Sequence, residues 1–155
     1  MKARIPYFAK HPRAAQAMLG LQSYVNASGL EHSILEFVKM RASQINGCAY
    51  CIDMHSKDAR AAGETEQRLY LLNAWREAPI YTDRERAALE WTEAVTRLGE
   101  HGVPDELYAA VREHYSEEEM VNLTLAIVAI NGWNRLNVAF RVEAGSYQPA
   151  TPRTA

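Results

Sequence analysis

The chain has 155 residues, of which 48% are hydrophobic and 23% are charged, a length and composition that fit one globular domain. Its 17 Lys and Arg residues are balanced by 19 Asp and Glu residues, and the resulting net charge of −2 argues against a nucleic acid as the main partner. Residues 1–14 lack the apolar stretch of a signal peptide, and the longest apolar run, at residues 125–130, is too short to cross a bilayer. We therefore expect a soluble, cytoplasmic protein with no membrane partner.

Four helices are predicted in the first half of the chain, at residues 12–28, 31–46, 48–62 and 65–72. Pro12 suits the first turn of a helix, because its fixed φ is helical and its missing amide hydrogen has no partner there. Gly47 and Gly63 are suited to the left-handed conformation that ends many helices. Between these signals, apolar residues recur at intervals of three and four, as on the buried face of a helix.

Three more helices are predicted in the second half, at residues 82–98, 104–114 and 116–143. Thr82 with Glu85, and Ser116 with Glu119, match the capping-box pattern at a helix start. Alternating β-branched runs joined by hairpin turns are scarce. Residues 1–145 are therefore expected to form one all-α domain, a compact bundle of about seven helices. Residues 146–155 contain two prolines and little apolar surface, and we expect a tail that is either mobile or clasped onto a neighbouring subunit.

Two cysteines and a histidine share one face of the helix predicted at residues 48–62. Cys48, Cys51 and His55 stand at positions i, i+3 and i+7. Cys48 would lie at the helix start, where unpaired amides and the helix dipole stabilise a thiolate. A single close pair is too little for a disulfide scaffold, which favours a chemical role. His55 could then take the thiol proton of Cys51, directly or through one water.

A glutamate on the preceding helix is placed to orient this histidine. Glu36 precedes Gly47 by eleven residues and His55 follows it by eight. On two antiparallel helices their heights would differ by about 4–5 Å, which a glutamate side chain can cover. The predicted chain has Glu36 holding and polarising His55, His55 deprotonating Cys51, and Cys48 closing a disulfide.

The same residues leave other functions open. Two cysteines, a histidine and a glutamate could also surround zinc, although structural zinc sites usually carry two separated ligand pairs, and we predict no metal. The same cluster could also serve a thiol–disulfide oxidoreductase, or a non-catalytic redox-sensing or zinc-binding protein.

The pattern of Glu36, eleven further residues and CxxCxxxH resembles the redox core of the alkylhydroperoxidase D group within the carboxymuconolactone decarboxylase family. The likeness includes the flanking residues Arg41, Ser43, Asn46 and Tyr50. Residues 131–135, with the sequence NGWNR, and residues 137–139 are similar to the closing helix of short family members. One departure is Tyr50, since founding members usually have a histidine at this position.

The resemblance implies a thiol-dependent peroxidase with an antioxidant role, built as a homotrimer or homohexamer. Cys51 matches the peroxidatic cysteine, Cys48 the resolving cysteine, and Glu36 with His55 the proton relay. Supporting roles are expected for Tyr50, Ser43, Asn46 and Arg135, the last of which would either hold an interface or line the pocket. The redox-active Cys48–Cys51 disulfide takes the place of a cofactor. The implied partners are a peroxide substrate and a dithiol reductant, for example of lipoyl type.

Overall fold

The structure is a computed structural model that describes residues 2–149, and within this range it contains eight α-helices and one 3₁₀ helix but no β-strand. The elements in chain order are α1 (Tyr7–Lys10), α2 (Pro12–Asn26), α3 (His32–Asn46), α4 (Ala49–Ala61), α5 (Glu66–Leu71), η1 (Leu72–Ala74), α6 (Asp83–Thr96), α7 (Asp105–Arg112) and α8 (Glu117–Phe140). All seven helices predicted from the sequence are present, so the all-α prediction is confirmed.

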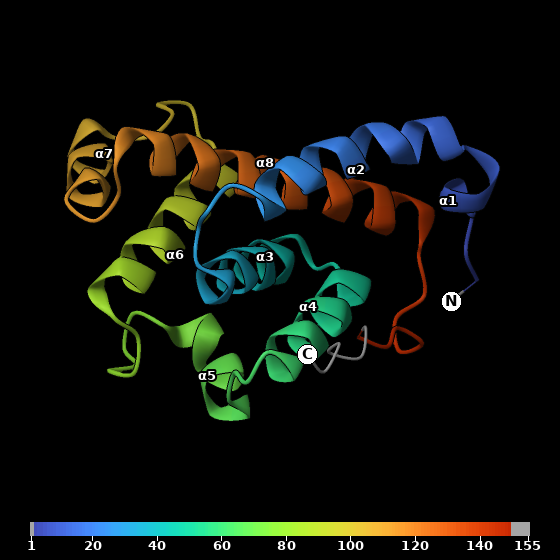
Figure 1. Ribbon diagram of the computed structural model, residues 1–155, viewed down its shortest axis with the longest axis horizontal. Coiled ribbons are helices and arrows are strands. Elements are labelled where there is room, and N and C mark those ends of the chain that lie inside the picture. The colour runs from blue at the N-terminus through green and yellow to red at the C-terminus, as the bar shows by residue number, and fades with distance from the viewer. Residues whose placement is uncertain (1, 150–155) are drawn as a thin grey trace.

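Helix α3 lies in the middle of the arrangement and contacts α4, α6 and α8, while α2 runs along α8 (Figure 1). Its consecutive residues 34–43 are all buried, polar and charged residues included, because other helices pack against α3. Two neighbouring residues of α3 belong to different apolar clusters. Val38 packs in one cluster with Leu123 and Ile127 of α8. Phe37 packs in the other. The burial of each such side chain stabilises the fold by about 1.5–3 kcal/mol.

Two capping boxes begin the helices of the second half as predicted. The Thr82 hydroxyl accepts the amide hydrogen of Glu85 while the Glu85 carboxylate accepts that of Thr82. Ser116 and Glu119 make the same reciprocal pair at the start of α8. Each cap satisfies amides that the first helical turn leaves without partners.

The structure differs from the prediction at the two ends of the chain. Helix α1 is additional, because four residues are too few to give a periodic pattern. Helix α8 ends at Phe140 rather than near residue 143, since Arg141 adopts a left-handed conformation with φ of 55° and Val142 donates back to the Asn137 carbonyl.

After α8 the chain returns across α4. The amide of Gly145 donates to Asp53, the Lys57 ammonium donates to the carbonyl of Tyr147, and the Tyr147 hydroxyl donates to Asp58. The predicted tail therefore begins, at residues 146–149, against the same chain. The expectation for residues 150–155 lies outside the described residues. Among the helices of residues 2–149, none has the length and apolar character that a bilayer span requires.

Candidate active site

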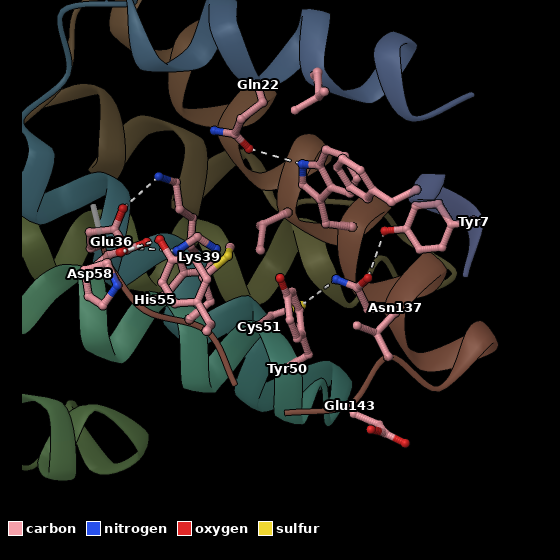
Figure 2. Close-up of a pocket in the computed structure, with 18 of the residues that line it drawn as sticks. Tyr7, Gln22, Glu36, Lys39, Tyr50, Cys51, His55, Asp58, Asn137 and Glu143 are labelled. Atoms are coloured by element: carbon pink, nitrogen blue, oxygen red, sulfur yellow. Dashed lines mark hydrogen bonds and ion pairs between the residues drawn. The ribbon is translucent and has the colours of Figure 1, made fainter. Parts of the chain in front are cut away.

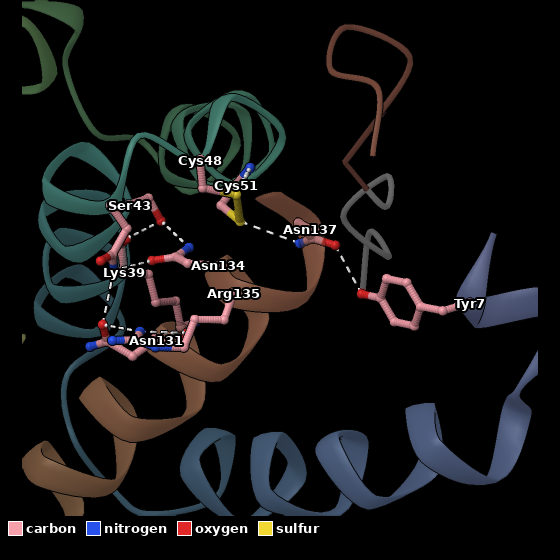
Figure 3. Close-up of a disulfide and its surroundings, with 10 residues drawn as sticks. Tyr7, Lys39, Ser43, Cys48, Cys51, Asn131, Asn134, Arg135 and Asn137 are labelled. Carbon is pink, nitrogen blue, oxygen red and sulfur yellow. Dashed lines mark hydrogen bonds between the residues drawn. A yellow bond between two sulfur atoms is a disulfide. The ribbon is translucent and has the colours of Figure 1, made fainter. Parts of the chain in front are cut away.

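The two cysteines lie at the turn between α3 and α4. Gly47 ends α3 with φ of 65°, a conformation that glycine adopts without a steric penalty. The next residue, Cys48, is the N-cap of α4, and its sulfur accepts the amide hydrogen of Cys51 at 3.3 Å. Cys48 and Cys51 form a disulfide with a Cα–Cα distance of 5.3 Å (Figure 3). The structure therefore represents the oxidised protein.

Only one of these cysteines reaches the large pocket of the molecule. The pocket has a volume of about 1450 Å³, is open to solvent, and is bounded by both ends of the described chain as well as by α2, α3, α4 and α8. Cys51 lines it, whereas Cys48 does not. Both residues are 1% exposed, so a reactant must enter the pocket to reach Cys51.

A buried ionic cluster lies at one end of this pocket (Figure 2). One oxygen of Glu36 accepts a hydrogen bond from Lys39 Nζ at 2.8 Å, and the other lies 3.0 Å from His55 Nδ1. Burial by itself raises the pKa of Glu36, but the hydrogen bonds and charges of His55 and Lys39 outweigh it and lower the pKa to about 2. Glu36 is therefore ionised, and its carboxylate fixes the tautomer in which His55 carries a proton on Nδ1.

His55 stands one helical turn after Cys51, on the same side of α4, and both line the pocket. With Nδ1 held by Glu36, Nε2 is the ring nitrogen left to accept a proton. This orientation suits a base that takes a proton from within the pocket. The predicted contact between Glu36 and His55 is present in the structure.

The predicted supporting residues divide into two groups. Tyr50 is half-buried and lines the pocket next to Cys51. Ser43 and Asn46 instead join α3 to α8. Asn134 donates to the Ser43 hydroxyl at 3.0 Å (Figure 3). Asn46 donates to Asn134 at 2.9 Å. Arg135 is exposed and hydrogen-bonds within α8, and it is not among the residues that line the pocket.

Arg41 belongs to a different network from the cysteines. It donates to Glu93 at 2.8 Å and to Asn73 at 2.6 Å, and Glu93 also accepts from the indole of Trp75. This network joins α3 to α6 and η1, so the contribution of Arg41 in this structure is to the packing of these elements.

Four residues of the site were not among the candidates from the sequence. They are Lys39, Asp58, Asn137 and Tyr7, which all line the pocket. The spacing offers a signal for Lys39, which follows Glu36 by three residues, and for Asp58, which follows His55 by three. Asn137 and Tyr7 come from segments distant in sequence, and no local spacing identifies them.

One group of residues has donor types suited to a metal ion. Single ligand atoms of Glu36, His55 and Asp58 lie within 4.8 Å of one another. This set differs from the four-residue zinc set considered from the sequence, because it contains no cysteine. Both oxygens of Glu36 already have partners in Lys39 and His55, so a metal would compete with these contacts.

The sequence is similar to that of two curated bacterial proteins. The uncharacterized protein YdfG of Bacillus subtilis is 47% identical over 146 residues, which cover 94% of this chain and 99% of YdfG. The uncharacterized protein YnjA of Escherichia coli is 28% identical over 117 residues, which cover 76% of this chain and 64% of YnjA.

The fold is similar to that of solved structures. ATU0492 of Agrobacterium tumefaciens, a protein of unknown function for which an AhpD-type role in antioxidant defence has been suggested, matches with a TM-score of 0.88 and 48% identity over 96% of this chain and 99% of that one. The debrominase Bmp8, in complex with 2,3,4-tribromopyrrole, has a TM-score of 0.80 at 23% identity, covering 90% of this chain and 74% of that one, a likeness of fold alone.

Residues 12–94 match the model of the carboxymuconolactone decarboxylase family. This match covers more than half of the chain and includes Glu36, both cysteines and His55. The protein therefore belongs to the carboxymuconolactone decarboxylase family, in its alkylhydroperoxidase D-like group.

Proposed function

We propose that the protein is a thiol-dependent peroxidase that reduces hydrogen peroxide or organic hydroperoxides. The observation that supports this most strongly is the position of Cys51 in the pocket wall, bonded to Cys48 and one helical turn from the His55–Glu36 pair. A nucleophile, a base with its orienting carboxylate and a resolving thiol are the groups that such a reaction requires.

The first step of the proposed reaction consumes the peroxide. In the reduced protein, His55 takes the thiol proton of Cys51, and the thiolate attacks the nearer peroxide oxygen. The S–O bond forms as the O–O bond breaks, which gives Cys51 sulfenic acid and an alkoxide or hydroxide. The proton returns from His55 to this leaving group, so the product is an alcohol or water.

The second step returns the protein to the state that the structure describes. The thiol of Cys48 attacks the sulfenic sulfur of Cys51, which forms the disulfide and releases water. A dithiol then reduces the disulfide by two successive exchanges and leaves as its own disulfide, so two electrons pass from the dithiol to the peroxide. We propose a slender dithiol of lipoyl type as this reductant, because both protein sulfurs are buried.

The burial of the sulfurs also bears on the alternative of a thiol–disulfide oxidoreductase. Exchange requires an attacking sulfur to approach along the axis of the disulfide, which a folded protein substrate cannot do at a cysteine that is 1% exposed. A small peroxide meets no such obstacle. The suggestion of antioxidant defence for ATU0492, 48% identical to this chain, supports the same choice.

Steady-state kinetics test the proposal. Catalytic amounts of the protein are mixed with dihydrolipoamide and either cumene hydroperoxide or a model aromatic disulfide, and dithiol consumption is followed. We expect turnover with the hydroperoxide to exceed turnover with the disulfide. We expect Cys51→Ser to abolish turnover with the hydroperoxide. Faster turnover of the disulfide would instead identify an oxidoreductase, and oxidation without turnover would identify a redox sensor.

A further inference from the structure

Cys51 has a hydrogen-bond donor that the reaction above does not use. The side-chain amide of Asn137, on α8, lies 3.3 Å from the Cys51 sulfur, and its oxygen accepts the hydroxyl hydrogen of Tyr7 at 2.8 Å (Figure 3). Asn137 is 7% exposed and Tyr7 is 6% exposed. The three residues thus form a buried chain from the N-terminal segment to the sulfur that lines the pocket.

The hydroxyl of Tyr7 fixes the orientation of the asparagine. Because the hydroxyl donates to the Asn137 oxygen, the amide nitrogen must face Cys51. Burial, and after it the neighbouring Tyr50, raise the pKa of Tyr7 to about 12, so this hydroxyl keeps its proton throughout the neutral range. The NH₂ group of Asn137 is therefore directed at the Cys51 sulfur in the disulfide form that the structure describes.

The two sulfurs differ in the donors that they receive. The Cys48 sulfur, at the N-cap of α4, accepts a backbone amide hydrogen and lies at the positive end of the helix. Cys51 is one turn further along and receives its side-chain donor from another helix. Since a thiolate accepts hydrogen bonds more strongly than a disulfide sulfur, the contact with Asn137 gains strength when the disulfide is reduced.

We propose that Asn137 is a catalytic residue that stabilises the Cys51 thiolate by hydrogen bonding, and that Tyr7 is the positioning residue that orients it. This inference rests on the proposed function, because it concerns the nucleophile of the same site. On this proposal, α8 and the N-terminal segment help to make Cys51, and not Cys48, the reactive cysteine.

Other ionisable groups also face the pocket around Cys51. They are Lys2 and Arg4 from the segment before α1, His32, Glu36 and Lys39 from α3, Tyr50, His55 and Asp58 from α4, and Glu143 and Tyr147 from the segment after α8. All of them are unchanged in the variants below, so differences between variants report on Asn137 and Tyr7.

The chain contains a second Tyr–Asn hydrogen bond that serves as a control. The Tyr24 hydroxyl of α2 donates to the Asn122 side-chain oxygen at 3.0 Å. Asn122 is buried like Asn137, whereas Tyr24 is 53% exposed and Tyr7 is 6% exposed. Asn122 also lies on α8, fifteen residues before Asn137, and neither residue of this pair lines the cysteine pocket. Tyr24→Phe and Asn122→Leu therefore remove the same kind of hydrogen bond without approaching the sulfurs.

The experiment measures the thiolate of Cys51 directly. All variants carry Cys48→Ser, so Cys51 is the single thiol, and the rate of alkylation by iodoacetamide is recorded from pH 5 to pH 10. A charge-assisted hydrogen bond corresponds to about a tenfold change in an ionisation equilibrium, so we expect Asn137→Leu to move the midpoint of this profile upward by about one pH unit. Tyr7→Phe should move it in the same direction by less, and the two control variants should leave it in place.

The outcomes separate this inference from the proposed function. A midpoint unchanged in both Asn137→Leu and Tyr7→Phe would overturn the inference, as would equal shifts in Tyr24→Phe or Asn122→Leu. If Asn137→Leu does not fold, Tyr7→Phe alone decides, because it keeps the aromatic ring and removes only the hydroxyl. Alkylation requires no peroxide, so a shifted midpoint in a protein that does not consume peroxide would leave the inference standing and reject the peroxidase.

Discussion

At the scale of single residues, the site combines Cys51, the proposed nucleophile, with a buried carboxylate that stays ionised. Glu36 is 3% exposed, and an isolated carboxylate at that depth would take up a proton. Lys39 and His55 each hold one of its oxygens and keep it ionised. Lys39 therefore contributes to the site by keeping Glu36 ionised.

The lowered pKa of Glu36 predicts a specific pH dependence of stability. The carboxyl has a pKa of about 2 in the folded protein and 4.5 in the unfolded chain, so between these values the unfolded state binds more protons. The resulting stabilisation is complete above pH 4.5 and is lost as the pH falls towards 2, with a total on the order of 3 kcal/mol.

Urea unfolding of the oxidised protein between pH 6 and pH 2.5 checks this dependence. The free energy of unfolding should fall more steeply with acid in the parent than in Glu36→Gln, which cannot titrate at this position. Other carboxyls with a lowered pKa contribute equally to both proteins, namely Glu31, Asp53, Glu93 and Glu119. Parallel curves for the two proteins would contradict the assigned state of Glu36.

Substitution of the two cysteines is expected to impair peroxide consumption in different ways. Cys51→Ser removes the nucleophile and should abolish peroxide consumption. Cys48→Ser leaves it in place but removes the resolving thiol, so one equivalent of peroxide should be consumed and Cys51 should stop as a sulfenic acid. Trapping with dimedone followed by intact mass measurement distinguishes these states. Full activity of Cys51→Ser, or sulfenic acid at position 48 in Cys51→Ser, would reverse the assignment of the two roles.

The sequence predicted part of this site and could not have predicted the rest. Glu36, Cys51 and His55 lie on two consecutive helices joined by a glycine, so residue spacing and helical rise were sufficient to expect the contact between Glu36 and His55. Asn137 and Tyr7 are brought to Cys51 by the packing of α8 and the N-terminal segment, across 86 residues in the case of Asn137. Such contacts depend on tertiary structure and leave no local pattern.

At the scale of elements, the turn between α3 and α4 sets the geometry of the site. The signals for it are local: Gly47 adopts the left-handed conformation and Cys48 caps the next helix. Local signals also placed the starts of α6 and α8. The end of α8 was misplaced because the residue in the left-handed conformation that ends it is Arg141, a residue type that rarely takes this conformation.

Gly47 provides a test of this turn. Its φ of 65° costs a residue with a Cβ atom about 1–2 kcal/mol, while nothing lies within 4 Å of the position that a Cβ would occupy. We therefore expect Gly47→Ala to lower the free energy of unfolding by about 1–2 kcal/mol and Gly47→Asn to lower it by less. Chemical denaturation of both variants measures this order. Equal stability of Gly47→Ala and the parent would show that the turn does not require the left-handed conformation.

At the scale of the whole molecule, the pocket depends on segments from both ends of the described chain. Phe8 of α1 stacks on Trp133 of α8 with ring centroids 5.8 Å apart, and Tyr147 lies across α4 through its hydrogen bond to Asp58. The similarity to YdfG and ATU0492 spans almost the full length of all three chains.

The oligomeric state of the whole molecule stays a prediction from the family resemblance. A homotrimer or homohexamer would cover apolar surface that is exposed in the single chain, such as Leu98, Val121 and Val128. Light scattering at several protein concentrations should give a mass that is three or six times that of one chain. The mass of a single chain throughout would contradict the expected assembly.

Stoichiometric oxidation of the Cys48–Cys51 pair by peroxide is the most direct test of the proposed function. Fully reduced, metal-free protein receives one equivalent of hydrogen peroxide or cumene hydroperoxide, and free thiols and intact mass are followed with time. If the protein is a peroxidase, both thiols and two hydrogen atoms should be lost within seconds, as the disulfide forms. Reduced protein that keeps both thiols over many minutes would contradict the proposed function.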